Sequence, residues 1–293
     1  MSVTVKPIDS LPDPVLKTVN SNYPQSKQTF LPKNYMVGCF LGARGGGKTY
    51  ACVKLIKQYE NHGIYDKDNN KVEIRTILFS PTIQANKIFN SLDSLADEDK
   101  HDGYSETKLK KLIEEIKEEK DKTENYKKDI QAYKRFIKAK NPDKLSTDDL
   151  LRLHALDFEE PEKPTYPFGQ VIFLVMDDLV GSKMYKPMGE SYFRNILLRN
   201  RHMGINIMML VQDLKSVPKS IRVNCSLFVS FRFSNKKIIE DMYQEFGSSM
   251  KEEDFTMLYK YATEKDHDAL VIDFTTEKQY RFKQNFNQIL SIV

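Results

Sequence analysis

The chain has 293 residues, of which 40% are hydrophobic and 29% charged, with a formal net charge of +4. This composition is typical of a globular protein with a charged surface, and the length suffices for one large α/β domain or two modest ones. No apolar run reaches the roughly 20 residues of a membrane-spanning helix, and residues 1–17 lack the apolar core and cleavage site of a signal peptide. We therefore expect an intracellular protein without a membrane partner. The slight positive charge is compatible with a nucleic-acid partner.

The first part of the chain combines a polar arm with the start of a sheet. Residues 1–30 are polar and dotted with prolines, which predicts an N-terminal arm. Residues 35–42 form a short apolar strand, residues 49–63 have apolar side chains at helical spacing, and residues 75–82 form a second strand. A strand, a glycine loop, a helix and a strand in this order predict a parallel α/β sheet.

Residues 85–168 have a different pattern and are predicted to be a helical insertion. The stretch 106–141 is dense in Glu and Lys, and its apolar residues form two helical stripes, so we expect two helices or one long helix with a weak middle: Leu109, Leu112, Ile113 and Ile116, then Tyr126, Ile130, Tyr133 and Ile137. A shorter helix is expected at 146–157. The leading interpretation is a solvated insertion; the alternative is a contact surface for a neighbouring subunit, a capsid or DNA.

The sheet resumes after the insertion. Apolar runs at 170–178, 205–213 and 226–233 predict further strands, helices are expected at 191–204 and 235–247, and residues 268–282 predict a terminal hairpin. We therefore expect one P-loop domain over 31–293, interrupted by the insertion. The three cysteines, Cys39, Cys52 and Cys225, lack CxxC spacing, so we expect reduced thiols and no structural zinc.

The glycine loop carries the strongest functional signal. Residues 42–49, GARGGGKT, match the P-loop pattern G-x-x-x-x-G-K-[ST] without deviation, between a strand and a helix. Glycines let backbone N–H groups turn inward around phosphate oxygens, helped by the positive end of the following helix. Lys48 is expected to reach the β- and γ-phosphates and Thr49 to hold Mg²⁺. The predicted nucleotide-binding residues are Gly42, Ala43, Arg44, Gly45, Gly46, Gly47, Lys48, Thr49 and Tyr50.

Polar side chains at the ends of two later strands complete the predicted site. The strand 171–176 ends in Asp177 and Asp178, the position of a Walker B motif. Asp177 is expected to support Mg²⁺, and Asp178 to polarise the attacking water as a general base. Gln212 ends the next strand at the edge where sheet ligands bind, and an amide there can contact both water and γ-phosphate.

These motifs together resemble the HerA/FtsK superfamily, and the segment LLRNRHMGINIMMLVQDLKSVPKSIRVNC is similar to the genome-packaging ATPases of large DNA viruses, poxviruses, virophages and Polinton-type elements. The resemblance covers about 35–85 and 170–250. It implies a RecA-like α/β fold, largely parallel with helices on both faces, and a ring of identical subunits that hydrolyses ATP with Mg²⁺. It further implies the Walker A and B roles given above, a sensor role for Gln212, and trans-acting or DNA-coupling roles for Arg199, Arg201 and Arg222.

The same resemblance implies the partners. Such motors drive double-stranded DNA, without reading its sequence, into a preformed capsid, so a capsid vertex is a further candidate partner. The protein is expected to be located in the host cytoplasm and in the virion. Three alternatives stay open from the sequence: a small-molecule P-loop enzyme such as a nucleotide kinase, a helicase or DNA-pumping factor outside packaging, and a nucleotide-binding adaptor with little turnover. A GTPase would be expected to contain the base-reading motif [NT]KxD, which the sequence lacks.

Overall fold

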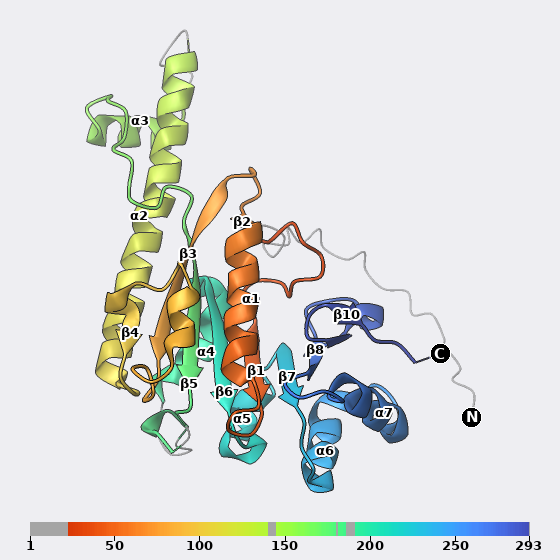
Figure 1. The fold of residues 1–293 in the computed structure, drawn as a ribbon. Coiled ribbons are helices and arrows are strands. Elements are labelled where there is room, and N and C mark those ends of the chain that lie inside the picture. Colours follow the sequence, from red (N-terminus) through yellow and green to blue (C-terminus); the bar gives the residue numbers. More distant parts are fainter. Residues whose placement is uncertain (1–22, 140–144, 180, 186–190, 293) are drawn as a thin grey trace, which may run out of the picture.

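The computed structural model describes residues 23–139, 145–179, 181–185 and 191–292. Its centre is a ten-stranded sheet with the strand order β10-β9-β8-β7-β1-β6-β5-β3-β2, and β4 pairs with β3 beside this path. Figure 1 shows the strands side by side, with helices in front of the sheet and behind it. The predicted RecA-like α/β fold, with a largely parallel sheet and helices on both faces, is confirmed.

The parallel part of the sheet consists of long apolar strands. These are β1 (Val37–Leu41), β3 (Lys71–Phe79), β5 (Gln170–Asp177), β6 (Ile205–Val211) and β7 (Leu227–Phe231). β1 pairs in parallel with both β6 and β7, and β5 pairs in parallel with both β3 and β6. β1, β6 and β7 are buried throughout, as expected for strands covered on both faces. Because the strands are parallel, their carboxyl ends lie at one edge of the sheet.

Two layers of helix cover the sheet. On one face, α1 (Lys48–His62) packs together with the 3₁₀ turn Lys87–Ser91. The other face is covered by the first half of α2 (Glu106–Lys138) and by α4 (Tyr192–Met203), α5 (Lys219–Arg222), α6 (Lys236–Met242) and α7 (Glu252–Ala262). A π-helical turn, Tyr243–Gly247, extends α6. α7 was not among the predicted elements.

The Glu- and Lys-rich stretch forms one continuous helix, α2, which resolves the two predicted alternatives. Ser105 caps it by accepting a hydrogen bond from the Lys108 N–H (3.4 Å). The first apolar stripe is buried in the core, whereas Ile137 of the second stripe is 64% exposed. The apolar stripe of the first half is therefore covered by the core, whereas the stripe of the second half is partly solvated. Phe89, Leu92 and Leu95, also within 85–168, belong to the core of the opposite face.

The outer half of α2 and α3 (Thr147–Ala155) form a projection that leaves and rejoins the domain at one place. The Thr123 hydroxyl donates to the Tyr166 carbonyl (2.7 Å), so the two ends of the excursion 124–165 are adjacent. Within the projection, Arg135 pairs with Asp149 of α3 through two hydrogen bonds. Figure 1 shows α3 beside the outer half of α2, beyond the end of the sheet.

The sheet continues past β7 with antiparallel strands. β8 (Ala269–Asp273) pairs with β7 and with β9 (Phe282–Gln284), as the predicted hairpin requires, and β10 (Gln288–Ile289) adds a further strand. The Lys283 amine donates to Asp273 (2.7 Å) in a buried ion pair and also to the Phe30 carbonyl (3.1 Å). The hairpin thus holds the end of the predicted arm, of which residues 1–22 lie outside the described residues.

Two short strands flank β3, and the three cysteines are reduced. β2 (Ile64–Tyr65) pairs with β3, and β4 (Lys100–His101) also pairs with β3; neither was predicted. Cys39 and Cys52 are buried and Cys225 is half-buried, all three as free thiols. Within the described part of the chain, no helix is long and apolar enough to cross a membrane.

Candidate nucleotide-binding site

The glycine loop connects the carboxyl end of β1 to the first turn of α1. Gly47 occupies the N-cap position with φ 104°, a left-handed conformation that residues with a Cβ rarely adopt. A Cβ on Gly42 would lie 3.0 Å from the Phe231 ring, so the loop also needs glycine for close packing. Because α1 begins at Lys48, its first unpaired N–H groups and the positive end of its dipole lie in this loop.

Lys48 is largely buried within the loop, with 8% of its surface exposed. Its amine donates to the carbonyls of Gly42 (2.8 Å) and Ala43 (3.0 Å). Burial lowers the pKa of Lys48, and the nearby carboxylates of Asp178 and Asp177 oppose this shift. The cation is therefore held where a phosphate oxygen could replace the two carbonyls.

Asp177 is the last residue of β5 and is 4% exposed. The Ser80 hydroxyl, just after β3, donates to its Oδ2 atom (2.9 Å). Burial raises the pKa of Asp177, and the hydrogen bond from Ser80 and the charge of Lys48 partly offset this effect. Ser80 thus fixes the orientation of one carboxylate oxygen at the carboxyl edge of the sheet.

Asp178 follows β5 with a positive φ of 51°, an uncommon conformation for a residue other than glycine. The Gln212 amide, directly after β6, donates from Nε2 to the Asp178 Oδ1 atom (2.8 Å). The amide and the carboxylate therefore meet across two adjacent strands. Backbone strain of this kind costs of order 1–3 kcal/mol and is concentrated at functional sites.

Lys48, Asp177, Asp178 and Gln212 all face one open cavity of about 630 Å³. Of the predicted site residues, the cavity is lined by Arg44, Gly45, Gly47, Lys48, Thr49, Tyr50, Asp177, Asp178 and Gln212. The other predicted loop residues, Gly42, Ala43 and Gly46, belong to the same loop without lining the cavity. The lining residues that were not predicted are Thr82, Ala85, Asn86, Ile88 and His267. Thr82 is the last residue of the second predicted strand, and no local pattern pointed to His267.

The three predicted arginines do not line this cavity. Arg199 and Arg201 are exposed near the carboxyl end of α4, which runs back from the carboxyl edge of the sheet toward the start of β6. They therefore lie at the opposite edge of the sheet. Arg222 pairs with Glu245 through two hydrogen bonds (2.7 and 2.6 Å) and also donates to the carbonyls of Leu214 and Val217. Its guanidinium is thus engaged within its own chain.

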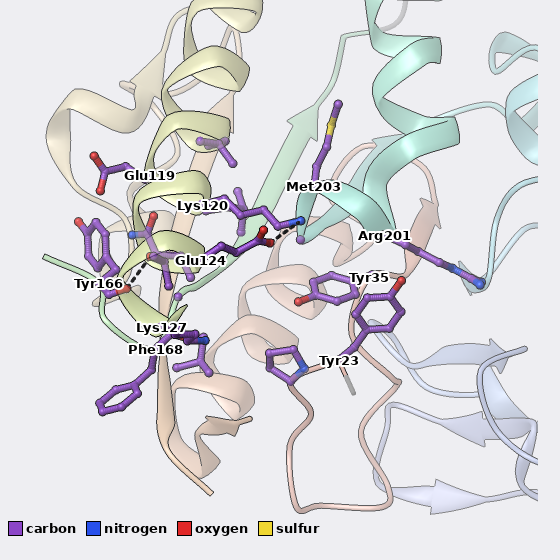
Figure 2. A pocket seen from close by; sticks show the side chains of 18 residues that line it. Tyr23, Tyr35, Glu119, Lys120, Glu124, Lys127, Tyr166, Phe168, Arg201 and Met203 are labelled. Atoms are coloured by element: carbon purple, nitrogen blue, oxygen red, sulfur yellow. Dashed lines mark hydrogen bonds and ion pairs between the residues drawn. The ribbon is translucent and has the colours of Figure 1, made fainter. Parts of the chain in front are cut away.

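A second, smaller cavity of about 230 Å³ lies at that opposite edge, between the middle of α2 and the end of α4. Figure 2 shows Tyr23 and Tyr35 on its wall, with the Arg201 side chain directed away from α2. The rings of the two tyrosines meet edge to face, with centroids 5.0 Å apart. Lys120 donates to the His202 carbonyl and also pairs with Glu124. This cavity is separate from the P-loop cavity, because its lining includes the first residues of β5.

Comparisons with known proteins show which solved structures this chain is similar to. No protein-family description matches the sequence, and no curated protein matches it. Among solved structures, the chain is similar to B204, the DNA-packaging ATPase from Sulfolobus turreted icosahedral virus (11% identity, TM-score 0.48, covering 86% of this chain and 97% of that one). It is similar to the genome packaging NTPase B204 from Sulfolobus turreted icosahedral virus 2 in complex with AMP (12%, TM-score 0.49, 88% and 98%). It is also similar to EssC (ATPases 2 and 3) from Geobacillus thermodenitrificans (18%, TM-score 0.43, 82% and 38%).

Proposed function

We propose that this chain is an ATPase that couples ATP hydrolysis to the movement of double-stranded DNA, and that it packages viral DNA into a preformed capsid. The observation that carries the ATPase part is the cavity at the carboxyl edge of the sheet. There a P-loop lysine and threonine, an acidic pair and a strand-end glutamine converge from three different segments. The step to DNA rests on the resemblance of segments 35–85 and 170–250 to the HerA/FtsK superfamily.

The phosphate end of ATP would bind over the glycine loop and the first turn of α1. Lys48 would exchange its two carbonyl partners for β- and γ-phosphate oxygens. The Thr49 hydroxyl and the Asp177 carboxylate are hard oxygen donors facing the same cavity, so they fit Mg²⁺. The bound ion would neutralise part of the phosphate charge.

Asp178 and Gln212 would act on the attacking water. The hydrogen bond between them fixes the carboxylate at the end of β5, beside the place expected for the γ-phosphate. From there Asp178 would accept the proton of the water, and the Gln212 amide would hold the carboxylate and contact the γ-phosphate. The shorter aspartate reaches less far than a glutamate would, and its position is set by the left-handed backbone of Asp178 and by the hydrogen bond from Gln212.

Identical subunits would assemble as a ring. Arg199 and Arg201 are exposed, and no ion pair of either is found among the described residues. At the edge opposite to their own P-loop, they could stabilise the transition state only in a neighbouring subunit. We keep Arg222 as a DNA-coupling candidate that acts through Glu245. DNA would be contacted through its phosphates, without sequence reading, with the capsid vertex as a further partner, in the host cytoplasm or virion.

The domain organisation is part of this proposal. Residues 31–293 would form one ATPase domain, with residues 1–30 as an arm and residues 85–168 as an insertion. The first part of the insertion packs against the sheet, since Leu95 and Ile116 both belong to the core, and its end returns to α2, where the Thr123 hydroxyl donates to the Tyr166 carbonyl. The part of the insertion free to meet a partner is therefore the projection 124–165.

Steady-state ATP hydrolysis, measured with and without linear double-stranded DNA, tests the function. We expect DNA to raise the rate, and Lys48→Ala to lower it by at least about 100-fold, because removal of one transition-state donor typically costs 10²- to 10³-fold. Circular dichroism of the variant checks that it folds. Packaging itself is then tested by protection of DNA from nuclease in the presence of empty capsids.

Each alternative predicts a different result. Hydrolysis that ignores DNA, together with phosphate transfer to a nucleoside monophosphate, would indicate a kinase-like enzyme. DNA-stimulated hydrolysis with strand separation would indicate a helicase. ATP binding without hydrolysis in every condition would indicate an adaptor and would refute the proposal.

A further inference from the structure

His267 lines the P-loop cavity but takes no part in the hydrolysis chemistry proposed above. It comes from the loop between α7 and β8, far from the glycine loop in sequence. Its side chain is exposed, and the described part of the chain provides no hydrogen-bond partner for its imidazole. A planar ring with a free donor and acceptor therefore faces the cavity.

The loop holds His267 in a specific position against the P-loop. A Cβ built on Gly47 would lie 3.4 Å from the Cβ atom of His267, so the two backbones are in close contact. His267 has a φ of 68°, a left-handed conformation in which histidine, asparagine and aspartate are enriched. The neighbouring Asp268 accepts hydrogen bonds from Gln284 (3.1 Å) and Asn285 (2.6 Å), which anchor the loop to the end of β9. The backbone that carries the imidazole is thus held beside the P-loop before any ligand binds.

The strand order shows which part of a nucleotide would meet this ring. β5 and β6, which carry Asp177, Asp178 and Gln212, lie on one side of β1, and β7 and β8 lie on the other. Because β8 is antiparallel to β7, its first residue, Ala269, pairs with Phe231 at the carboxyl edge. At about 4.8 Å per strand, the start of β8 is therefore roughly 20 Å across the sheet from the strand of the acidic pair.

We propose that His267 contacts the nucleoside, base or ribose, of the bound ATP. The reacting γ-phosphate must lie beside the acidic pair, and the glycine loop takes up the middle of the triphosphate. The other end of the molecule then leaves the loop on the β7–β8 side, where His267 is positioned. This inference rests on the proposed function, because it assumes that the P-loop binds a nucleoside triphosphate.

The choice of substitution follows from the backbone. Alanine is poorly suited to a φ of 68°, whereas asparagine adopts this conformation readily, so His267→Asn removes the ring with the least disturbance. His267→Gly serves as a second variant that also tolerates the backbone. His62→Asn is the matched control: His62 is exposed at the opposite end of α1, about 20 Å away.

The test is calorimetric binding of Mg²⁺–ATP and of Mg²⁺–tripolyphosphate, which has the phosphates without a nucleoside. We expect His267→Asn and His267→Gly to weaken ATP binding about tenfold, the effect of one lost contact of ordinary strength, and to leave tripolyphosphate binding within about twofold. The His62→Asn control should bind both ligands as the wild type does.

Two results would overturn the inference alone. In one, both His267 variants bind ATP as tightly as the wild type does, which places the nucleoside elsewhere, for example against Tyr50 and Ile88. In the other, the affinities for ATP and tripolyphosphate fall equally, which assigns His267 to the phosphates or to loop stability. A wild-type protein that binds neither ligand would refute the proposed function and the inference together.

Discussion

The hydrogen bond between Gln212 and Asp178 gives a direct test of the proposed chemistry. Gln212→Leu keeps the approximate size of the side chain and removes the N–H that donates to Asp178 over 2.8 Å. A hydrogen bond to a charged group contributes about 1.5–3 kcal/mol. If the bond acts mainly in the transition state, its loss should lower kcat by about 10- to 150-fold.

The other parameters should change little. The Gln212 side chain is exposed, so the free energy of unfolding should stay within about 0.5 kcal/mol of the wild-type value. KM for ATP should also stay similar, because the lysine and the glycine loop remain. Steady-state hydrolysis over a range of ATP concentrations separates these quantities.

A matched control is available at the other end of the molecule. Gln279 is likewise exposed and donates to a carboxylate, Glu277, over 3.0 Å. Gln279→Leu should leave kcat unchanged. An unchanged kcat in Gln212→Leu, or a raised KM with constant kcat, would refute the reasoning, since Gln212 would then hold only the bound substrate or nothing at all.

Three further predictions concern stability and the projection. Burial raises the pKa of Asp177 above 3.8, so the folded protein holds that proton more tightly and stability falls as the pH rises from 3.8 through the raised pKa. Asp177→Asn should therefore raise the melting temperature at pH 7 but not at pH 3, and a lower value at pH 7 would contradict this. Leu109→Ala should cost about 2–5 kcal/mol in urea unfolding, and the exposed Ile137→Ala less than about 0.5 kcal/mol; equal losses would show that α2 is not anchored by its first half. Replacing 124–165 by two glycines should leave calorimetric ATP binding intact, and loss of binding by the soluble variant would show that the projection supports the site.

The central part of the fold could be predicted because its signals are local. A strand, three glycines, a lysine and a threonine define the P-loop within a single short stretch, and the apolar runs fix the buried strands. Asp177, Asp178 and Gln212 could be placed together because parallel strands end at one edge. Their convergence on one cavity in the structure follows from this simple geometric rule.

Other contacts of the site depend on pairing between distant segments. Ser80 and Asp177 are separated by 97 positions, and their hydrogen bond requires β3 to lie beside β5. His267 reaches the cavity only because β8 is antiparallel to β7 and starts at the carboxyl edge of the sheet. Neither arrangement can be predicted from the local sequence, since a serine after a strand and a histidine in a polar loop are both common in proteins.

The sequence pattern of the charged helix α2 does not show which of its halves packs against the sheet. The two halves of α2 have similar alternation of apolar and charged residues, yet the first packs against the sheet and the second is partly solvated. The two halves differ because the sheet is too short to cover the second one. The helix of 33 residues is about 50 Å long at 1.5 Å per residue, whereas a nine-residue strand such as β3 spans about 30 Å.

The projection therefore extends past the edge of the sheet where β5 and β6 begin. Its last 15 helical residues, 124–138, correspond to about 22 Å. Arg199 and Arg201 lie at this same edge. If these arginines enter a neighbouring subunit's site in the proposed ring, the projection must lie next to that neighbour as well. Deletion of 124–165 would then reduce hydrolysis that depends on assembly while sparing the binding of ATP by a single subunit, which separates a role in subunit contact from a role in the site itself.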